Sequence, residues 1–440
     1  MTLSTFSLVR KITRSVRCDI KIVNWLKLEM SPSASHKWHF APRFRRNAFG
    51  WRSQSAVTRV KEAVAEIKKT ARKDPILAAE GAVLFLEKVS SALAHVDSSS
   101  GAIGSAVNNA VDVLVSVIAA ASADDSLRDR WLDRLWQAVE NDDIPYIEIL
   151  PEYWGELCAT PERASKWADS FAEGVRTAWE KKASSGHFVY FKGESACFSA
   201  LLKAGRNKEV LSLLDRSPYK WWDYRKWGVK ALVAMGRKAE AIRYAEDKLE
   251  INDPQYEIAR TCEDILLSSG MADEAYARYA IEANRGTTNL ATFRAIAKKY
   301  PRKTAKEILS DLVESTHGDE GKWFAASKSA GLYDEAIELA NMAPCDPRTL
   351  TRAAKEGAKE RPDFAIEAGM AALRWICEGY GYEITSLDIL EAYRYTMEAA
   401  ANAGKGPETL ERVRRLAASK SPSARFVAEA LRKELQRANG

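Results

Sequence analysis

Hydrophobic residues recur every three or four positions along most of this chain, on a background of charged and polar residues. Near the start of this pattern Val57, Val60, Val64 and Ile67 fall on one face of a helix with 3.6 residues per turn. No run alternates Val, Ile or Thr with polar residues for long enough to predict a sheet. The pattern therefore predicts an all-α protein. Further helices are predicted over residues 76–94, 103–121 and 127–139.

A short pattern repeats at nearly constant spacing further along the chain. In each copy one helix ends at a small residue and Gly, or Pro in one copy, and a second helix follows. Gly adopts the left-handed conformation that ends a helix at no steric cost. A constant step of this size predicts one helix pair per repeat. Weaker copies are expected at 358–366 and 403–408, the latter offset by an insertion around 379–382. The five clear turns are centred on Gly205, Gly236, Gly270, Pro301 and Gly331, which lie 31, 34, 31 and 30 residues apart.

These turns resemble those of tetratricopeptide repeats. The segment 331–340, which reads Gly-Leu-Tyr-Asp-Glu-Ala-Ile-Glu-Leu-Ala and is followed by Pro344, looks like that family's turn and second helix, and 236–242 and 270–276 are similar. The first helices depart from the family, because its aromatic and Leu-Gly pattern is scarcely visible there. The resemblance covers 196–344. It implies a right-handed α-solenoid with a concave face that holds protein or peptide partners, and it transfers no catalytic residue.

The formal net charge of +6 conceals two regions of opposite charge. Residues 1–73 hold 17 Lys and Arg against 4 Asp and Glu, a net charge of +13, so the remainder carries −7. A basic head on an acidic body predicts either an arm that binds a polyanion or a segment that docks on the body itself. A solvated arm without a partner is the third alternative.

The most distinctive part of the basic head is the segment 36–52, in which five aromatic residues alternate with four arginines. Such side chains could stack on bases and neutralise phosphates. They could equally clamp the arm to the body, with the arginines against its acidic surface, and this interpretation is preferred because an unanchored arm rarely needs five large aromatic residues. Met30 is the expected native start, which would make 1–29 an incorrectly assigned extension. The residues assigned to polyanion binding or intramolecular docking are Trp38, Arg43, Arg45, Arg46, Trp51 and Arg52.

The densest aromatic cluster is the segment 218–227, with five large aromatic side chains and three cations. If it begins the first helix of a repeat, part of it would face the groove and grip an acidic or Pro-rich peptide. The alternative is that these side chains pack between neighbouring helix pairs. The residues proposed for partner binding are Tyr219, Trp222, Tyr224 and Lys226.

Several classes of function lack support in the sequence. The longest apolar stretch, 110–123, is shorter than the about 20 residues that cross a bilayer, so no membrane association is predicted. The six cysteines lie 32 or more residues apart, which is typical of reduced thiols in a cytoplasmic protein. His36 and His39 share a helical spacing but have no partner ligand nearby, so no metal site is predicted.

Nucleophile and phosphate-loop signatures are also incomplete. The segment 193–197 lacks the second Gly of a serine elbow, and 404–406 is too short for a phosphate-binding loop. The chain is therefore predicted to be non-enzymatic, with no catalytic residue and no cofactor.

The sequence predicts a basic arm over 1–55, an N-terminal helical region over 56–150, helical repeats over 151–400 and capping helices over 401–440. The predicted function is a cytoplasmic scaffold that binds a protein or peptide on its concave face. The alternative is a protein that binds nucleic acid or another polyanion through the basic arm. Neither the partner nor the oligomeric state follows from the sequence.

Overall fold

The computed structural model describes residues 36–185, 191–247, 252–418 and 421–437. These residues form 21 α-helices and three short 3₁₀ helices, and they contain no β-strand. The predicted all-α class is confirmed. Contacts divide the chain into two compact units, of which the first ends at Tyr219 and the second begins at Lys220. This boundary lies inside the segment 151–400, and the four-part organisation stays a prediction. Residues 1–35, which include Met30, lie outside the described residues.

The predicted helices of the first unit begin close to the predicted positions, and Asp side chains cap two of them, α3 and α5. Asp74 accepts a hydrogen bond from the Leu77 backbone N–H, and Asp124 accepts one from Leu127. The elements are η2 (Ala41–Arg43), α2 (Ser53–Ala71), α3 (Pro75–Ala92), α4 (Ala102–Ala120), α5 (Asp125–Glu140), η3 (Leu150–Tyr153), α6 (Trp154–Cys158), α7 (Pro161–Ser185), α8 (Glu194–Lys203) and α9 (Asn207–Arg216).

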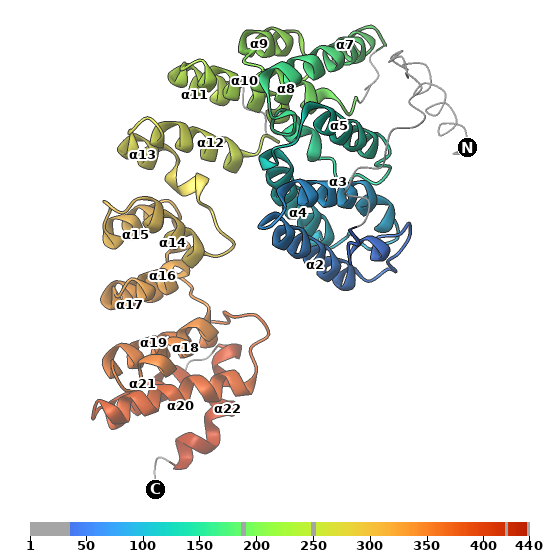
Figure 1. Cartoon of the computed structure of the whole chain (residues 1–440). Coiled ribbons are helices and arrows are strands. Elements are labelled where there is room, and N and C mark those ends of the chain that lie inside the picture. Colours follow the sequence, from blue (N-terminus) through green and yellow to red (C-terminus); the bar gives the residue numbers. More distant parts are fainter. Residues whose placement is uncertain (1–35, 186–190, 248–251, 419–420, 438–440) are drawn as a thin grey trace. The chain divides into compact units, whose positions relative to one another are not determined.

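The second unit consists mainly of consecutive helix pairs (Figure 1). Its elements are α10 (Trp222–Ala234), α11 (Lys238–Glu246), α12 (Gln255–Leu267), α13 (Ala272–Ala283), α14 (Asn289–Lys299), α15 (Ala305–Glu314), η4 (Glu320–Trp323), α16 (Phe324–Ser329), α17 (Tyr333–Met342), α18 (Pro347–Gly357), α19 (Pro362–Cys377), α20 (Ser386–Asn402), α21 (Gly406–Ala417) and α22 (Pro422–Arg437).

The turn inside a helix pair is made in the same way in several pairs. Gly205, Gly236, Gly270 and Gly331 have φ values of 74°, 75°, 75° and 79°, which is the left-handed region that only Gly adopts without strain. Gly404, with φ of 69°, turns between α20 and α21 in the weaker copy. The turn between α14 and α15 contains Pro301 in place of Gly, as the sequence predicts.

From α14 onward, successive pairs contact each other through equivalent helices. First helices pack against first helices, as α14 does against α16 and α18 against α20. Second helices pack against second helices, as α17 does against α19 and α19 against α21. This arrangement is consistent with a helical repeat.

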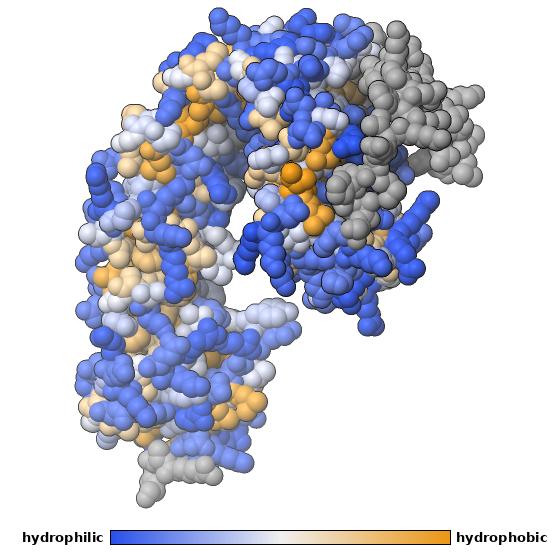
Figure 2. Space-filling model, in the orientation of Figure 1, coloured by the Kyte–Doolittle hydropathy of each residue, from blue (hydrophilic) through white to orange (hydrophobic). Residues whose placement is uncertain are grey.

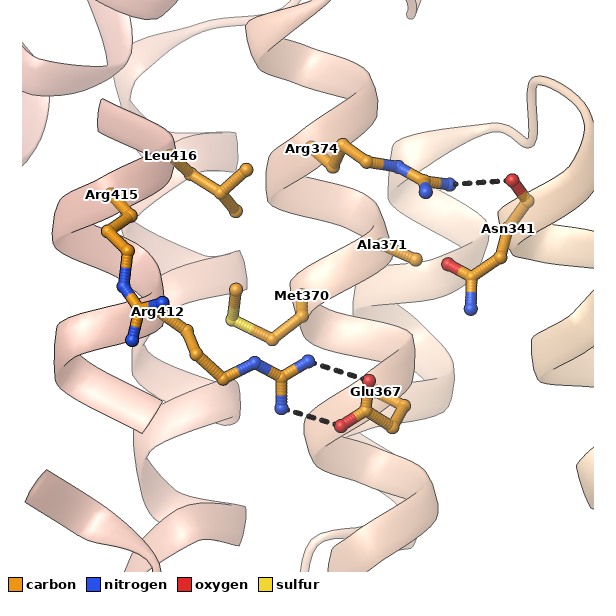
Figure 3. A pocket seen from close by; sticks show the side chains of 8 residues that line it. All are labelled: Asn341, Glu367, Met370, Ala371, Arg374, Arg412, Arg415 and Leu416. Carbon is orange, nitrogen blue, oxygen red and sulfur yellow. Dashed lines mark hydrogen bonds and ion pairs between the residues drawn. The ribbon is translucent and has the colours of Figure 1, made fainter. Parts of the chain in front are cut away.

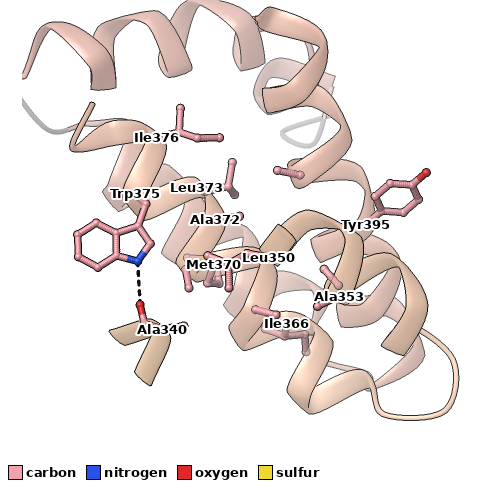
Figure 4. Close-up of a cluster of buried hydrophobic side chains, with 14 of the residues drawn as sticks. Ala340, Leu350, Ala353, Ile366, Met370, Ala372, Leu373, Trp375, Ile376 and Tyr395 are labelled. Atoms are coloured by element: carbon pink, nitrogen blue, oxygen red, sulfur yellow. Dashed lines mark hydrogen bonds between the residues drawn. The ribbon is translucent and has the colours of Figure 1, made fainter. Parts of the chain in front are cut away.

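An apolar core runs through the helices from α16 to α22. Met370, Leu373 and Ile376 of α19 are buried together with Leu350 of α18 (Figure 4). Trp375 is also buried, and its Nε1–H donates a 2.8 Å hydrogen bond to the Ala340 carbonyl oxygen, so the aromatic ring enters the core with its polar atom satisfied. This core fixes the positions of α17, α19 and α21 relative to one another.

A polar cluster joins the pair α12/α13 to the pair α14/α15. Glu263 is fully buried, and its carboxylate accepts hydrogen bonds from Asn284 Nδ2 at 2.7 Å, Tyr300 Oη at 2.6 Å and Lys299 Nζ at 2.5 Å. Tyr276 Oη donates to the Asp311 carboxylate at 2.6 Å across the same junction. The buried Glu263 carboxylate is tolerated because its three hydrogen bonds and the ammonium charge of Lys299 compensate for its lost hydration.

Candidate partner-binding surfaces

The aromatic segment 218–227 is largely part of the protein interior. Trp222 is buried; its backbone N–H donates to Asp253 at 3.2 Å and its Nε1–H to Glu257 at 3.1 Å. Tyr219 is buried as well, and Tyr224 is half-buried. The structure therefore leaves little of the Tyr219 and Trp222 rings for a partner to contact.

The charged residues of this segment are also engaged within the protein. Lys226 Nζ lies 3.6 Å from the Asp223 carboxylate. Arg225, which sequence reasoning missed, is buried and donates to the Asp247 and Ala245 carbonyl oxygens at 2.8 and 2.7 Å. Among the large aromatic residues of this segment, Trp221 is exposed, with 44% of its surface accessible to solvent.

The first described residues of the basic head pack on the first unit. Trp38, Phe40 and Phe44 are buried, and the last two contact the Phe85 ring of α3 at centroid distances of 5.8 and 5.0 Å. The backbone N–H groups of His39 and Phe40 donate to the two oxygens of Glu66, at 2.8 and 3.1 Å. These contacts attach the segment to α2 and α3.

Among the arginines assigned to this segment, Arg43 forms an ion pair with α2. Its Nη1 lies 3.0 Å from Glu62 on α2. Trp38 fits over Gly81 of α3, where an added Cβ would lie 2.2 Å from the indole ring. Trp38 and Arg43 thus contact helices of the chain itself.

The remaining assigned residues form an exposed loop, 45–52. The side chains of Arg45, Arg46 and Arg52 are exposed and have no ion-pair partner among the described residues. The Trp51 side chain is 72% accessible. The loop is held at both ends, since the Asn47 N–H donates to the Ser91 carbonyl oxygen and the Trp51 carbonyl oxygen accepts from Asp97, each at 2.9 Å.

Two partly open grooves lie between helices of the second unit. The larger, which we call the α19/α21 groove, has a cavity of about 350 Å³ and is drawn in Figure 3. Its lining comes from the second helices α17, α19 and α21. The lining residues are Asn341, Glu367, Met370, Ala371, Arg374, Arg412, Arg415 and Leu416.

The α19/α21 groove combines an apolar centre with a basic edge. Arg412 makes two hydrogen bonds to the Glu367 carboxylate, at 2.6 and 2.7 Å (Figure 3). Arg374 donates to the Ala340 carbonyl oxygen at 2.8 Å and stacks on Trp375, with its Cζ 4.5 Å from the ring centroid. Sequence reasoning missed this groove, because nothing in a single sequence shows that Arg374 and Arg412, in different helix pairs, share one opening.

The second groove, of about 260 Å³, lies between the first helices α18 and α20. Arg348 bonds to the Asp388 carboxylate at 2.8 Å, and Lys355 Nζ lies 5.3 Å from the Tyr395 ring centroid. The Arg348 guanidinium lowers the pKa of Asp388 well below its ordinary value of 3.8. Arg348 and Asp388 are therefore already paired in this groove, which is lined by three cations and two carboxylates, against three cations and one carboxylate in the α19/α21 groove.

Exposed apolar side chains are distributed rather than gathered in one area. The face shown in Figure 2 is mostly hydrophilic, with hydrophobic residues in small patches. Tyr382, Leu387 and Met342, at 79%, 72% and 66% accessible, are the most exposed large apolar residues of the second unit. Single exposed apolar residues are ordinary on protein surfaces and do not by themselves identify an interface.

Among the residues that the structure describes, the cysteines and histidines show no arrangement typical of a reactive or metal-binding site. The five described cysteines are free and buried, and burial raises the pKa of Cys158, Cys197 and Cys345 to about 12. Those thiols remain protonated at neutral pH, which makes them poor nucleophiles. In the parts of the chain that are described, no group of three His, Cys, Asp or Glu side chains is placed to hold a metal ion.

One helix of the described residues, α4, is long and apolar enough to cross a membrane by length and composition alone. It packs against α2, α3 and α6, and its exposed positions include Ser105, Asn109, Asp112 and Ser116. Length and composition are weak evidence that α4 spans a membrane, because the core helix of a soluble protein passes the same test.

Comparison with known proteins gives no assignment. No family model matches the chain, and no curated protein matches it significantly.

Proposed function

We propose that this chain is a helical-repeat scaffold that binds a protein partner, with its pairs stacked as a tetratricopeptide-like α-solenoid. The observation that supports the proposal is the repeated helix pair, which turns at a left-handed Gly in most copies and, from α14 onward, contacts the next pair through equivalent helices. Such stacking produces long surfaces made from equivalent positions of successive pairs. Surfaces of this kind suit an extended peptide segment better than a compact small molecule.

The grooves between pairs support the same proposal. Both grooves are partly open to solvent, are lined by residues of at least two helix pairs and contain arginine beside apolar side chains. Arg and Met are enriched at protein interfaces, whereas deep enclosed cavities are typical of small-molecule sites.

Affinity capture followed by co-elution tests the proposal. The tagged full-length chain is incubated with lysate of its own cells, and the captured material is separated by size-exclusion chromatography. We expect a partner protein to co-elute with the chain in a constant ratio. Elution of the chain alone, with nothing enriched over a tag-only control, would overturn the proposal.

A second function is favoured by the loop 45–52. Three exposed arginines of this loop have no ion-pair partner among the described residues and share the loop with an exposed tryptophan, and arginine with an exposed aromatic ring is a combination that binds single-stranded nucleic acid through phosphate contacts and base stacking. The rings of Trp38, Phe40 and Phe44 do not contribute to this surface, because they are buried.

A further inference from the structure

The α19/α21 groove has a floor and an edge of different chemistry. Met370 and Ala371 of α19 are buried and Leu416 of α21 is half-buried, and these three side chains form the floor (Figure 3). The edge is basic because it contains three arginines, Arg374 of α19 and Arg412 and Arg415 of α21. A floor of thioether and aliphatic groups accepts one apolar side chain of variable shape.

The positive charge of the edge is only partly neutralised. Arg374 donates to backbone carbonyl oxygens, which carry no net charge, and the Glu378 carboxylate lies 3.9 Å from its Nε. That Nε is buried and has no hydrogen-bond acceptor. Its surroundings therefore stabilise the guanidinium charge less than a bidentate carboxylate would.

Arg415 is the most accessible cation of the groove. Its side chain is 73% exposed, and its Nε lies 3.8 Å from the Glu411 carboxylate. Glu411 is shared, because Arg414 Nη1 lies 3.9 Å from the same carboxylate. Arg412, by contrast, is already bound on both Nη atoms by Glu367. Arg415 is thus the arginine of this groove that can most readily bind a new anion.

We infer that the α19/α21 groove binds an acidic segment of a partner protein, with one apolar side chain on the Met370 and Leu416 floor and a carboxylate on Arg415. A second carboxylate of the segment reaches Arg374 on the opposite side. This inference rests on the proposed function and specifies the site and the ligand chemistry. The planar guanidinium groups match carboxylates in geometry, and the charge pattern excludes basic segments.

The lining favours a peptide over nucleic acid. Base recognition in single strands relies on exposed aromatic faces, and no aromatic side chain lines this groove. The nearest ring, that of Trp375, is buried and covered by Arg374. The floor can contact an aliphatic or methionine side chain but cannot stack on a base.

A phage-displayed library of random 12-residue peptides tests the inference with the full-length chain. The chain is compared with Arg415→Glu and with the control Arg302→Glu, which reverses an exposed arginine outside the groove. We expect the chain and the control to select peptides with at least two acidic residues close to Leu, Ile, Met or Phe. Arg415→Glu should lose that selection while its circular dichroism spectrum stays unchanged.

The affinity of one selected peptide provides the second measurement. Fluorescence anisotropy should show that Arg415→Glu weakens binding by about tenfold or more and that Arg302→Glu changes it by less than about twofold. Selection of basic or uncharged peptides, absence of any selection, or equal loss in both variants would overturn the inference. The proposed function is judged separately, since a partner that co-elutes with Arg415→Glu as well as with the unaltered chain would support the scaffold and exclude this groove.

Discussion

Charged side chains at the ends of some helices contribute to local stability in this chain. Asp388 is the clearest example, because it serves two elements at once. Its carboxylate accepts from the Thr385 backbone N–H at 2.8 Å, which completes a capping box at the start of α20, and it binds Arg348 of α18. The guanidinium and the cap both favour the charged form of Asp388, which is why its pKa is depressed.

The variant Asp388→Asn tests this arrangement. We expect it to lower the free energy of unfolding by about 1 kcal/mol at pH 7, the usual value of a helix cap. A depressed folded-state pKa means that the stabilisation is present above the unfolded pKa and is lost as the pH falls through the folded pKa. Urea denaturation should therefore show the difference from the unaltered chain shrinking below pH 3.8.

The control for this experiment is Glu429→Gln, which removes an exposed carboxylate that has no ion-pair partner within the described residues. It should leave the unfolding free energy within about 0.5 kcal/mol at every pH. A difference for Asp388→Asn that stays constant down to pH 2 would contradict the assignment.

At the scale of elements, small residues decide how closely segments approach. Gly81 leaves room for the Trp38 ring, and Gly228 of α10 does the same for Tyr244, whose ring would lie 2.5 Å from an added Cβ. Gly104 of α4 has nothing within 4 Å of its Cβ position. Gly81 and Gly104 are therefore a matched pair inside helices, one with a packing role and one without.

The pair Gly81→Ala and Gly104→Ala tests the docking of the segment 36–44. In a helix, Ala is favoured over Gly by up to about 1 kcal/mol, so Gly104→Ala should stabilise the protein slightly. Gly81→Ala should instead destabilise it by about 1–3 kcal/mol, because the new methyl group displaces Trp38. Thermal unfolding measures both effects.

Limited proteolysis adds a readout that is specific for the docked segment. Trypsin should cleave after Arg43 faster in Gly81→Ala than in Gly104→Ala, since displacement of Trp38 also frees its neighbours. Equal stabilisation by both substitutions, with unchanged cleavage, would show that Trp38 does not depend on Gly81.

The sequence predicted the elements better than the surfaces they form. Gly331 and Pro301 could be recognised as turns because backbone conformation is a local property of these residues. Whether Trp222 packs inside or faces a groove could not be decided, since both outcomes share the same periodicity. Arg374 and Arg415 line the same groove only because of how α19 and α21 pack, and tertiary packing of that kind leaves no local signature in the sequence.

At the scale of the whole molecule, charge is distributed unevenly along the chain. The first 73 residues carry a net +13 and the rest −7. Some of the basic residues are neutralised by the chain itself, as Arg43 is by Glu62. Arg45, Arg46 and Arg52 have no ion-pair partner in the described part of the chain, where they give the loop 45–52 an unbalanced positive charge.

Salt dependence tests whether this loop binds nucleic acid. The variant in which Arg45, Arg46 and Arg52 are all changed to Gln should bind a single-stranded oligonucleotide more weakly. Each lost phosphate contact contributes about −0.7 to the slope of log affinity against log salt concentration, so the slope should become shallower by about 2. Anisotropy titrations at several NaCl concentrations provide this slope.

A matched triple variant controls for net charge. Changing Arg216, Arg243 and Arg302 to Gln removes three exposed arginines from other places and should leave the slope within about 0.5 of the unaltered chain. If both triple variants change the slope equally, binding is non-specific attraction to the whole protein, and the loop has no special part in it.

The junction at Glu263 differs from the partly exposed ion pairs Arg348–Asp388 and Arg412–Glu367 of later pairs, because its carboxylate is fully buried. Hydration of charged groups becomes less favourable on heating, so the cost of keeping Glu263 and Lys299 away from water falls, while the gain from apolar burial levels off. On warming, the junction between α12/α13 and α14/α15 should therefore weaken less than its apolar neighbours. Heat would then unfold the second unit from its apolar parts first, with this charged junction among the last contacts to break.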